Sequence, residues 1–534
     1  MSASRMAAVF VFAAYAASGQ HHEAAAAEKP VEILAGLGTW HHPIATSSPE
    51  AQKFFNQGLT LLYGFNRYEA LRSFRKAAEL DRSAAMPWWG MAMAYGPHIN
   101  MDFDGDVDMK ASCEAASSGL RIANTPAIER INLEAVMSRC PEYKPDAYIA
   151  AMRALVGRCP DDPDAAALLA ESLLLPVRWH WYSNDGVPAA GVTEAEQVLE
   201  QVMRRYSDHP GANHFYIHAV ESSRTPERGI PSAQRLMGIV PSAGHLVHMP
   251  GHIWMVLGEY ETVANVNERA VEVDRRYFAE TGVNSSYAGY LAHNLDFLLA
   301  ARWMQGNAAD AMRATEALTD AMAPMADAMP EMTDAFLMTP LMTQARFGRW
   351  DEILKAPQPA AKFLLSNALY HHFRAIASEA SGNRPGALLE QRAFEAARPI
   401  VPADRQWGTN TAGPMLAMVS EILSGRVAES PAAAVPHWQR AVAMQDALIY
   451  DEPPDWYYPL RESFGAALLR SGQAAQAETV FREGLRRSPH NGRILFGLLE
   501  SLKAQNKKDA AAWVSREFEL AWKKADITLR IEDL

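Results

Sequence analysis

The sequence predicts an all-α protein folded as an α-solenoid, in which helix-turn-helix units stack side by side. The prediction rests on an internal repeat of about 34 residues and on the alternation of large and small side chains within it. Large residues pack one helix on the next, and small residues let two helices cross closely, because a single helix pair cannot bury its own apolar face. The first two copies align Phe54 with Trp88, Gly58 with Ala92, and Leu61 with Tyr95.

The same pattern returns along the chain, so the solenoid is expected to cover most of it. Further copies begin near Gly251, Leu295, Phe347 and Gly465, and Gly497 starts another copy 32 residues after Gly465. One copy contains the string Leu-Gly-Glu-Tyr, which ends at residue 260. Its glycine is expected to close the first helix of the pair, where a left-handed backbone is needed.

These repeats resemble the tetratricopeptide repeat (TPR) family. The resemblance implies a right-handed superhelix with a concave groove, lined by the first helix of each pair. Four strings are moreover similar to parts of large exported bacterial TPR proteins of unassigned function, namely Gly38–Pro43, Gly211–His218, Gly244–His252 and Glu452–Pro459. The resemblance therefore implies a fold and no reaction.

The composition is that of a folded chain that does not bind nucleic acid. Apolar residues make up 49% and charged residues 21% of the 534 residues, which excludes wholesale disorder. The net charge is −12, and no basic cluster is available to neutralise phosphates. We divide the chain into a signal peptide with a flexible lead (1–26), an irregular segment (27–50), N-terminal repeats (51–110), divergent helical repeats (111–210), central histidine-rich repeats (211–350) and C-terminal repeats (351–534).

The N-terminus predicts export to the periplasm or cell envelope. Arg5 precedes an apolar run from Met6 to Ala17 that contains an Ala-x-Ala pattern, as a secretory signal does. A buried N-terminal helix is the alternative. The run is too short to span a bilayer, and no later segment is apolar enough, so no integral membrane span is expected. Export would permit one disulfide among Cys113, Cys140 and Cys159, with Cys140–Cys159 preferred, although three buried thiols are equally compatible with the sequence.

Histidines concentrate in the central repeats. Their spacings of three and four residues place them on shared helix faces, where imidazoles can converge on a transition-metal ion. In the register that the TPR resemblance implies, the groove is lined by His245, His248, His252 and Met255 in one repeat and by His293 and Asp296 in the next. The register is ambiguous for the preceding pair, His214 and His218. Six of the 17 histidines lie in this stretch, namely His214, His218, His245, His248, His252 and His293.

Other groove positions are expected to lie outside this cluster. Met338 and His372 continue the same column of positions in later repeats. Packed helix axes lie about 8–10 Å apart, and zinc–nitrogen bonds are about 2 Å. Side chains two repeats apart therefore cannot share an ion, which excludes His372 from the cluster. Met255, Met338 and His372 are interpreted as contacts for a groove ligand. Pro250 lies inside the histidine-bearing helix and is expected to kink it, unless it is a packing accident.

The candidate metal site consists of His245, His248, His252, His293 and Asp296, and His214 and His218 can join it. Three interpretations remain open for the first five residues. They could hold a copper or zinc ion, contact a peptide or small molecule, or be structural. For His214 and His218 the structural interpretation is favoured, because buried imidazoles often bond to backbone carbonyls.

Three further patterns are weaker. A methionine stripe at Met322, Met325, Met329 and Met332 is interpreted as core rather than as a copper site. The alternating aspartates from Asp102 to Asp108 fail the EF-hand pattern and predict a solvated acidic loop. The pairs His21-His22 and His41-His42 are too short to specify a metal.

The sequence favours a binding protein over an enzyme. It contains no serine elbow, no phosphate-binding glycine loop and no dinucleotide fingerprint. The first hypothesis is an exported TPR scaffold that holds a protein or peptide in its groove. The alternative is a copper- or zinc-binding protein, or a metal-dependent enzyme, that uses the central histidines.

Overall fold

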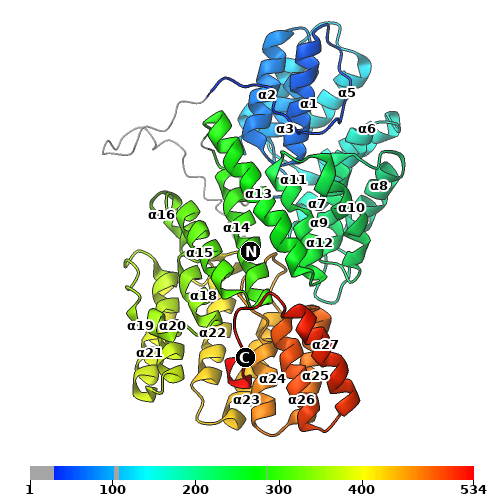
Figure 1. Ribbon diagram of the computed structural model, residues 1–534. Helices are drawn as coiled ribbons and strands as arrows, with labels where there is room; N and C mark the ends of the chain where they lie inside the picture. The colour runs from blue at the N-terminus through cyan, green and yellow to red at the C-terminus, as the bar shows by residue number, and fades with distance from the viewer. Residues whose placement is uncertain (1–28, 101–106, 284) are drawn as a thin grey trace, which may run out of the picture.

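The computed structural model describes residues 29–100, 107–283 and 285–534 and confirms the all-α class. Figure 1 shows the helices of the first half packed as neighbouring antiparallel rods. They are α1 (Pro49–Tyr63), α2 (Arg67–Leu80), α3 (Met86–Tyr95), α4 (Met109–Leu120), α5 (Ala127–Met137), α6 (Pro145–Arg158), α7 (Pro163–Leu174), α8 (Val192–Arg205), α9 (Pro210–Glu221), α10 (Ile230–Ile239), α11 (Gly244–His248) and α12 (Pro250–Val256).

The second half continues the same stacking of helices. Its helices are α13 (Tyr260–Thr281), α14 (Ala288–Gln305), α15 (Ala308–Met322), α16 (Met325–Ala328), α17 (Pro330–Thr333), α18 (Thr339–Arg346), α19 (Trp350–Lys355), α20 (Leu364–Ala380), α21 (Arg384–Ala397), α22 (Ala412–Arg426), α23 (Pro431–Asp446), α24 (Arg461–Arg470), α25 (Ala474–Arg487), α26 (Gly492–Ala504) and α27 (Lys508–Ala521). The two strands are short and antiparallel, β1 (Gln406–Trp407) and β2 (Asn410–Thr411), with Gln406 opposite Thr411.

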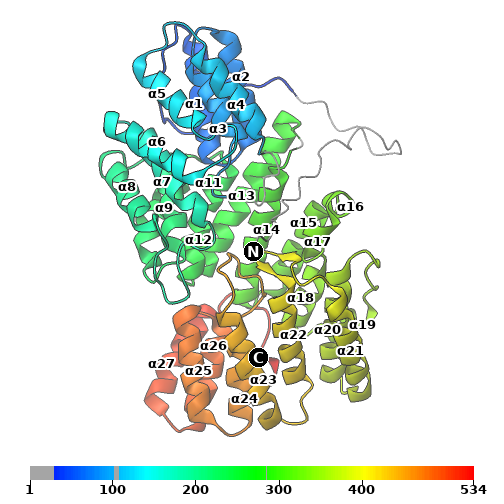
Figure 2. The same cartoon turned by 180° about the vertical axis from the view of Figure 1, so that it is seen from behind.

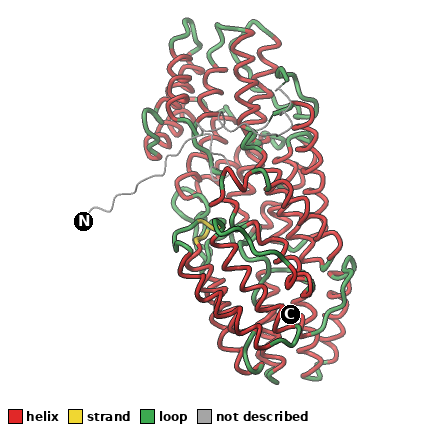
Figure 3. Tube along the Cα trace, turned by 90° about the vertical axis from the view of Figure 1, so that its left-hand side faces the viewer, coloured by secondary structure: helices red, strands yellow, loops and turns green. Residues whose placement is uncertain are grey.

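The helices form an elongated solenoid with α13 and α14 in the middle. Helices α1 to α12 lie on one side of this pair, and α15 to α27 lie on the other (Figures 1 and 2). Seen from the side, the helices stack along the long axis of the molecule (Figure 3). Buried side chains form one apolar cluster in each half and a smaller one at the C-terminal end. Across the described residues, no helix combines the length and the apolar character that crossing a membrane would require.

The small residues of the repeat sit where helices cross, as the sequence predicts. Gly58 on α1 and Gly90 on α3 lie against the two faces of Phe74 on α2, and a Cβ on either glycine would come within 2.7 Å or 2.5 Å of its ring. Near the C-terminus, Gly465 and Gly497 hold the same positions around Phe481. The repeat therefore has one packing motif, an aromatic ring clasped between two glycines.

The turn and the kink around the central histidines also follow the sequence. Gly258 ends the first helix of its pair with a φ of +77°, in the left-handed region that glycine allows. Pro250 divides α11 from α12, while Met249 between them keeps a helical backbone. The result is a kinked helix, which changes the direction in which the histidines after Pro250 point.

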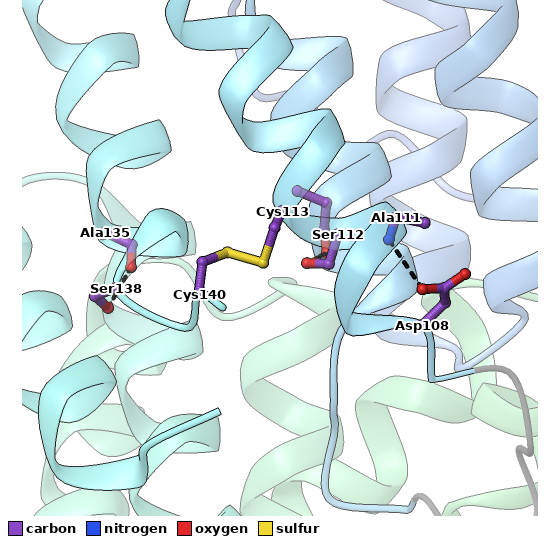
Figure 4. Close-up of a disulfide and its surroundings, with 8 residues drawn as sticks. Asp108, Ala111, Ser112, Cys113, Ala135, Ser138 and Cys140 are labelled. Carbon is purple, nitrogen blue, oxygen red and sulfur yellow. Dashed lines mark hydrogen bonds between the residues drawn. A yellow bond between two sulfur atoms is a disulfide. The ribbon is translucent and has the colours of Figure 1, made fainter. Parts of the chain in front are cut away.

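The predicted cysteine pairing is wrong. The disulfide joins Cys113 on α4 to Cys140, which follows α5, with their Cα atoms 5.7 Å apart (Figure 4). Cys159 is a free, half-buried thiol. The reason is helix length: the 14 residues of α6 separate Cys140 from Cys159, and a helix of that length spans about 21 Å.

The methionine stripe does not form one helical face. Helix α15 ends at Met322, and the following methionines lie in the short helices α16 and α17 and the turns around them. Met322 is buried in the core, in line with the core interpretation, whereas Met325 and Met329 are half-buried. The signal peptide, the pair His21-His22 and the aspartates from 102 to 106 lie outside the described residues.

The segment between α23 and α24 packs inside the molecule. It crosses the middle of the molecule (Figure 2) and buries Trp456, Tyr457 and Tyr458. The Trp456 ring contacts His372 with centroids 5.8 Å apart, and the Tyr457 ring contacts Trp303 at 5.8 Å. The string Glu452–Pro459 therefore lies against His372, a residue that the repeat register assigns to the groove, and we call the chain from 447 to 460 the groove-crossing segment.

Candidate functional site

The six central histidines come together in one buried cluster. Helix α9 supplies His214 and His218, the kinked α11–α12 supplies His245, His248 and His252, and α14 supplies His293. The first five are almost completely buried, and His293 is half-buried. Their imidazole nitrogens form two groups in which the possible ligand atoms lie within 4.8 Å of one another: His214, His218 and His245, and His248, His252 and His293. We call these the inner triad and the outer triad.

Glu221 links the two triads. It lies one turn after His218 on α9, and its Oε1 is 2.8 Å from His218 Nδ1. Its Oε2 is 2.5 Å from His252 Nδ1. Burial alone would raise the pKa of this carboxyl, but His252 and His218 lower it to about 2. Glu221 is therefore ionised and accepts a hydrogen bond from the Nδ1–H of one histidine in each triad.

Two further histidines are also oriented through Nδ1. His214 Nδ1 lies 2.6 Å from the Tyr63 carbonyl oxygen, to which it donates. His248 Nδ1 lies 2.7 Å from Asn267 Oδ1. The amide nitrogen of Asn267 donates to the Val263 carbonyl at 2.8 Å, so the amide oxygen faces the imidazole and accepts its proton. Four of the six rings are thus fixed in the Nδ1–H tautomer.

These tautomers leave Nε2 lone pairs facing each other. His248 Nε2 and His252 Nε2 are 2.9 Å apart, and neither carries a proton when Nδ1 does. Two facing lone pairs repel, so the pair requires a cation: either a proton shared between them or a metal ion. Metal-bound histidines show this same arrangement, with one nitrogen on the ion and the other donating to a protein oxygen.

Burial favours the neutral imidazole form at four of the six histidines. Burial holds the pKa values of His214, His245 and His248 well below 6.5, and neighbouring imidazoles lower them further. Burial likewise lowers the pKa of His293 to about 3. Neutral imidazoles are the form that binds transition metals.

Asp296 is not part of the ligand groups that the described residues form, although the sequence places it with them. Burial and the nearby Asp451 raise its pKa to about 7. It lies one helical turn after His293 and faces the segment that crosses the groove rather than the imidazoles. The carboxylate of the site is instead Glu221, which continues the face of His214 and His218 by one turn and could have been found from that spacing.

The groove-crossing segment reaches the cluster through Tyr450. Its hydroxyl lies 3.0 Å from Glu452 Oε2 and 3.5 Å from Glu221 Oε2. Burial and the charge of Glu221 hold the pKa of Glu452 well above its usual range. The site is thus enclosed by residues from both halves of the chain.

The residues predicted to contact a groove ligand do not line an open groove. Met255 and Met338 belong to the apolar core, and His372 is completely buried. His372 is covered by the Trp456 ring of the groove-crossing segment, with ring centroids 5.8 Å apart. His372 lies outside both triads, as the repeat spacing predicts.

The string Gly38–Pro43 belongs to a separate, structural cluster around Asp164. This carboxylate accepts hydrogen bonds from Trp40 Nε1 at 3.0 Å and Tyr63 Oη at 2.6 Å, and it lies 2.8 Å from His42 Nδ1. Burial alone would raise the pKa of Asp164, but His209 and His42 hold it well below its usual range. With its oxygens occupied, Asp164 fastens the N-terminal segment to α1 and α7.

Comparison with known proteins adds no function. No protein-family model matches the sequence, and no curated protein matches it. Solved structures to which the chain is similar include yeast Tom70, with 11% identity, a TM-score of 0.33 and coverage of 90% of this chain and 93% of that chain. A human IFIT1 dimer with PPP-AAAA has 13% identity, a TM-score of 0.33 and coverage of 87% and 90%. The APC/C hetero-tetramer Cut9-Hcn1 has 12% identity, a TM-score of 0.28 and coverage of 90% and 97%. Such low scores carry no inference about a ligand.

Proposed function

We propose that this chain is a helical-repeat protein that binds a transition-metal ion at the outer triad, His248, His252 and His293. One observation carries the proposal: the Nε2 lone pairs of His248 and His252 face each other at 2.9 Å while their Nδ1 protons are donated to Asn267 and Glu221. Tetrahedral zinc–nitrogen bonds of 2.0–2.1 Å would place two such nitrogens about 3.3 Å apart. A small outward shift of the rings would admit the ion.

The ligand set favours copper or zinc. Imidazole suits late first-row ions, and the site offers no thiolate that would select Cu(I). Three protein ligands leave a fourth position for water or a substrate, which is the arrangement from which metal-ion catalysis starts.

Elemental analysis tests the metal proposal directly. Protein prepared without a histidine tag and incubated with Zn²⁺ or Cu²⁺ should retain at least one equivalent after dialysis. His248→Ala and His252→Ala should each lower the content, while His372→Ala, an equally buried histidine outside the cluster, should leave it unchanged. Less than about a tenth of an equivalent in the wild-type protein would show that a proton, and not a metal, joins His248 to His252.

We also propose that the protein is exported. The apolar run at the N-terminus and the Cys113–Cys140 disulfide support this, because disulfides persist in oxidising compartments. Cell fractionation with N-terminal sequencing should recover an envelope form that lacks the first residues. A full-length cytoplasmic protein with three free thiols would contradict the proposal.

A protein partner is a second proposed ligand, at a different place from the buried groove. A cleft of about 520 Å³ lies over α13, α14 and α15, and its lining includes the apolar Leu291 and the charged Arg275, Arg313, Glu316 and Asp320. Mixed charges beside apolar side chains suit a peptide or helix of a partner. In affinity capture from envelope extracts, the Arg313→Glu variant should fail to retain a specific partner that the wild-type protein retains. Arg516→Glu, an exposed control on α27, should still retain it. Identical capture by both variants argues against this site.

A further inference from the structure

The inner triad is a second set of three imidazoles beside the proposed ion. His214, His218 and His245 are completely buried, and their possible ligand nitrogens lie within 4.8 Å of one another. The triads are in contact: the rings of His218 and His252 have centroids 5.2 Å apart, and those of His245 and His248 are 5.5 Å apart. Any ion in the inner triad would therefore be an immediate neighbour of the outer one.

In the inner triad, as in the outer triad, hydrogen bonds from Nδ1 leave the Nε2 lone pairs free to bind an ion. His218 donates its Nδ1–H to Glu221, and His214 donates its Nδ1–H to the Tyr63 carbonyl. Both therefore hold an Nε2 lone pair directed into the cluster. His214 Nε2 lies 3.2 Å from His245 Nε2, close to the separation of about 3.3 Å that tetrahedral zinc–nitrogen bonds would give.

Hydrogen bonding within the protein does not satisfy this triad. If His245 donates from Nε2 to His214, then His218 Nε2 still has no hydrogen-bond partner within the described part of the chain. Buried polar atoms are seldom left in this state, and each such atom calls for an explanation such as a missing ion or water. A metal ion would engage a nitrogen of each ring at once.

We propose that the inner triad binds a second transition-metal ion, so that the cluster is a dinuclear centre with Glu221 between its two halves. One carboxylate oxygen of Glu221 orients His218 of the inner triad, and the other orients His252 of the outer triad. His218, Glu221 and His252 themselves form a group with ligand atoms within 4.8 Å of one another. The negative charge of Glu221 also reduces the repulsion between two neighbouring cations. This inference rests on the proposed function, because the second ion is defined by its proximity to the first.

Counting Cu²⁺ ions tests the inference and separates it from the proposed function. Wild-type protein titrated with Cu²⁺ should retain two equivalents per chain. Electron paramagnetic resonance should show a mononuclear signal at one equivalent, and spin coupling between the two ions at two equivalents. Saturation at one equivalent would overturn the second ion and leave the proposed function intact, whereas no retained copper would overturn both.

Matched substitutions assign the ions to the triads. His245→Gln should lower the content from two equivalents to one and abolish the spin coupling, and His293→Gln should also leave one. The control variant His372→Gln, which replaces a buried histidine outside the cluster, should still bind two ions. Circular dichroism melts identify any variant that does not fold, in which case the wild-type count decides. A folded His245→Gln protein that keeps two coupled ions would contradict the assignment.

Discussion

At the scale of single residues, the hydrogen-bond partner of each imidazole decides which of its nitrogens carries the proton. His218 and His252 have the same tautomer because one ionised carboxylate, Glu221, accepts from both. His248 reaches this state through the Asn267 amide instead. Such outer partners set the orientation and basicity of a metal ligand, so Glu221 and Asn267 belong to the site as much as the imidazoles do.

Asp274 is the residue from which we expect a measurable pH dependence. It is buried beside the site, where Tyr287 Oη and Asn294 Nδ2 donate to it at 3.0 Å and 2.7 Å. Burial raises its pKa to about 7. Since the folded state then holds this proton more tightly than the unfolded state, the stabilisation is complete below the unfolded pKa of about 3.9. It is lost as the pH rises through 7.

The substitution Asp274→Asn should remove this contribution, because an amide does not titrate, and its single oxygen can still accept from Asn294. The melting temperature of the wild-type protein should fall more between pH 5 and pH 8 than that of the variant. Equal falls in thermal melts at the two pH values would show that Asp274 does not titrate in this range.

At the scale of helices, the glycine pairs around one aromatic ring set how closely the repeats pack. Gly465→Ala would place a Cβ 2.5 Å from the Phe481 ring, which has no room to move. We expect it to lower the free energy of unfolding by about 1–3 kcal/mol, the usual cost of overpacking.

A matched glycine tests that reasoning. Gly157 lies in α6, and a Cβ there would meet nothing within 4 Å. Gly157→Ala should therefore stabilise the protein by about 0.5–1 kcal/mol, through the higher helix propensity of alanine. Chemical denaturation of both variants measures the two effects, and effects of the same sign would contradict the packing explanation.

The disulfide links two helices of the divergent repeats (111–210). It ties α4 to the end of α5, and the two cysteines are 27 residues apart in the sequence. The double substitution Cys113→Ser and Cys140→Ser should cost about 2–4 kcal/mol in unfolding free energy, provided that this region unfolds with the rest. Cys159→Ser is the control, because it keeps the disulfide. A reducing agent should lower the melting temperature of this variant as much as that of the wild-type protein.

At the scale of the whole molecule, one segment joins the two halves of the solenoid. The chain from 447 to 460 places Trp456 and Tyr457 against helices of the second half and Tyr450 against Glu221 of the first. A further contact between the halves comes from Asn184, whose side-chain amide donates to the Asp446 carbonyl at 2.7 Å. The metal site and the closure of the solenoid are therefore coupled.

Trp456→Ala should consequently loosen the molecule as a whole. Removing a buried tryptophan costs about 3–5 kcal/mol, and hydrogen exchange should quicken in α20 and around the histidine cluster. Trp513→Ala on α27, where the ring is 57% exposed, should change the stability little. Exchange that quickens only next to residue 456 would show that the segment does not join the halves.

The sequence by itself determined the class of fold, the repeat packing and the helices that carry the histidines, because these depend on local periodicity. The glycines around Phe74 and Phe481, the left-handed Gly258 and the kink at Pro250 all follow from neighbours within one repeat. The spacing of His245, His248 and His252 likewise brings their rings to one side of a helix.

Only the tertiary structure decided what those histidines face. It made Glu221 the carboxylate of the site in place of Asp296, brought His214 and His218 into the cluster and paired Cys113 with Cys140. It also buried Met255, Met338 and His372, the last of them against Trp456. The segment from 447 to 460 lies about 200 residues from the central histidines in the sequence, and no helical periodicity encodes such a contact. Whether a concave face stays open or is filled depends on the path of the whole chain, because the occupant comes from a different repeat than the residues it covers.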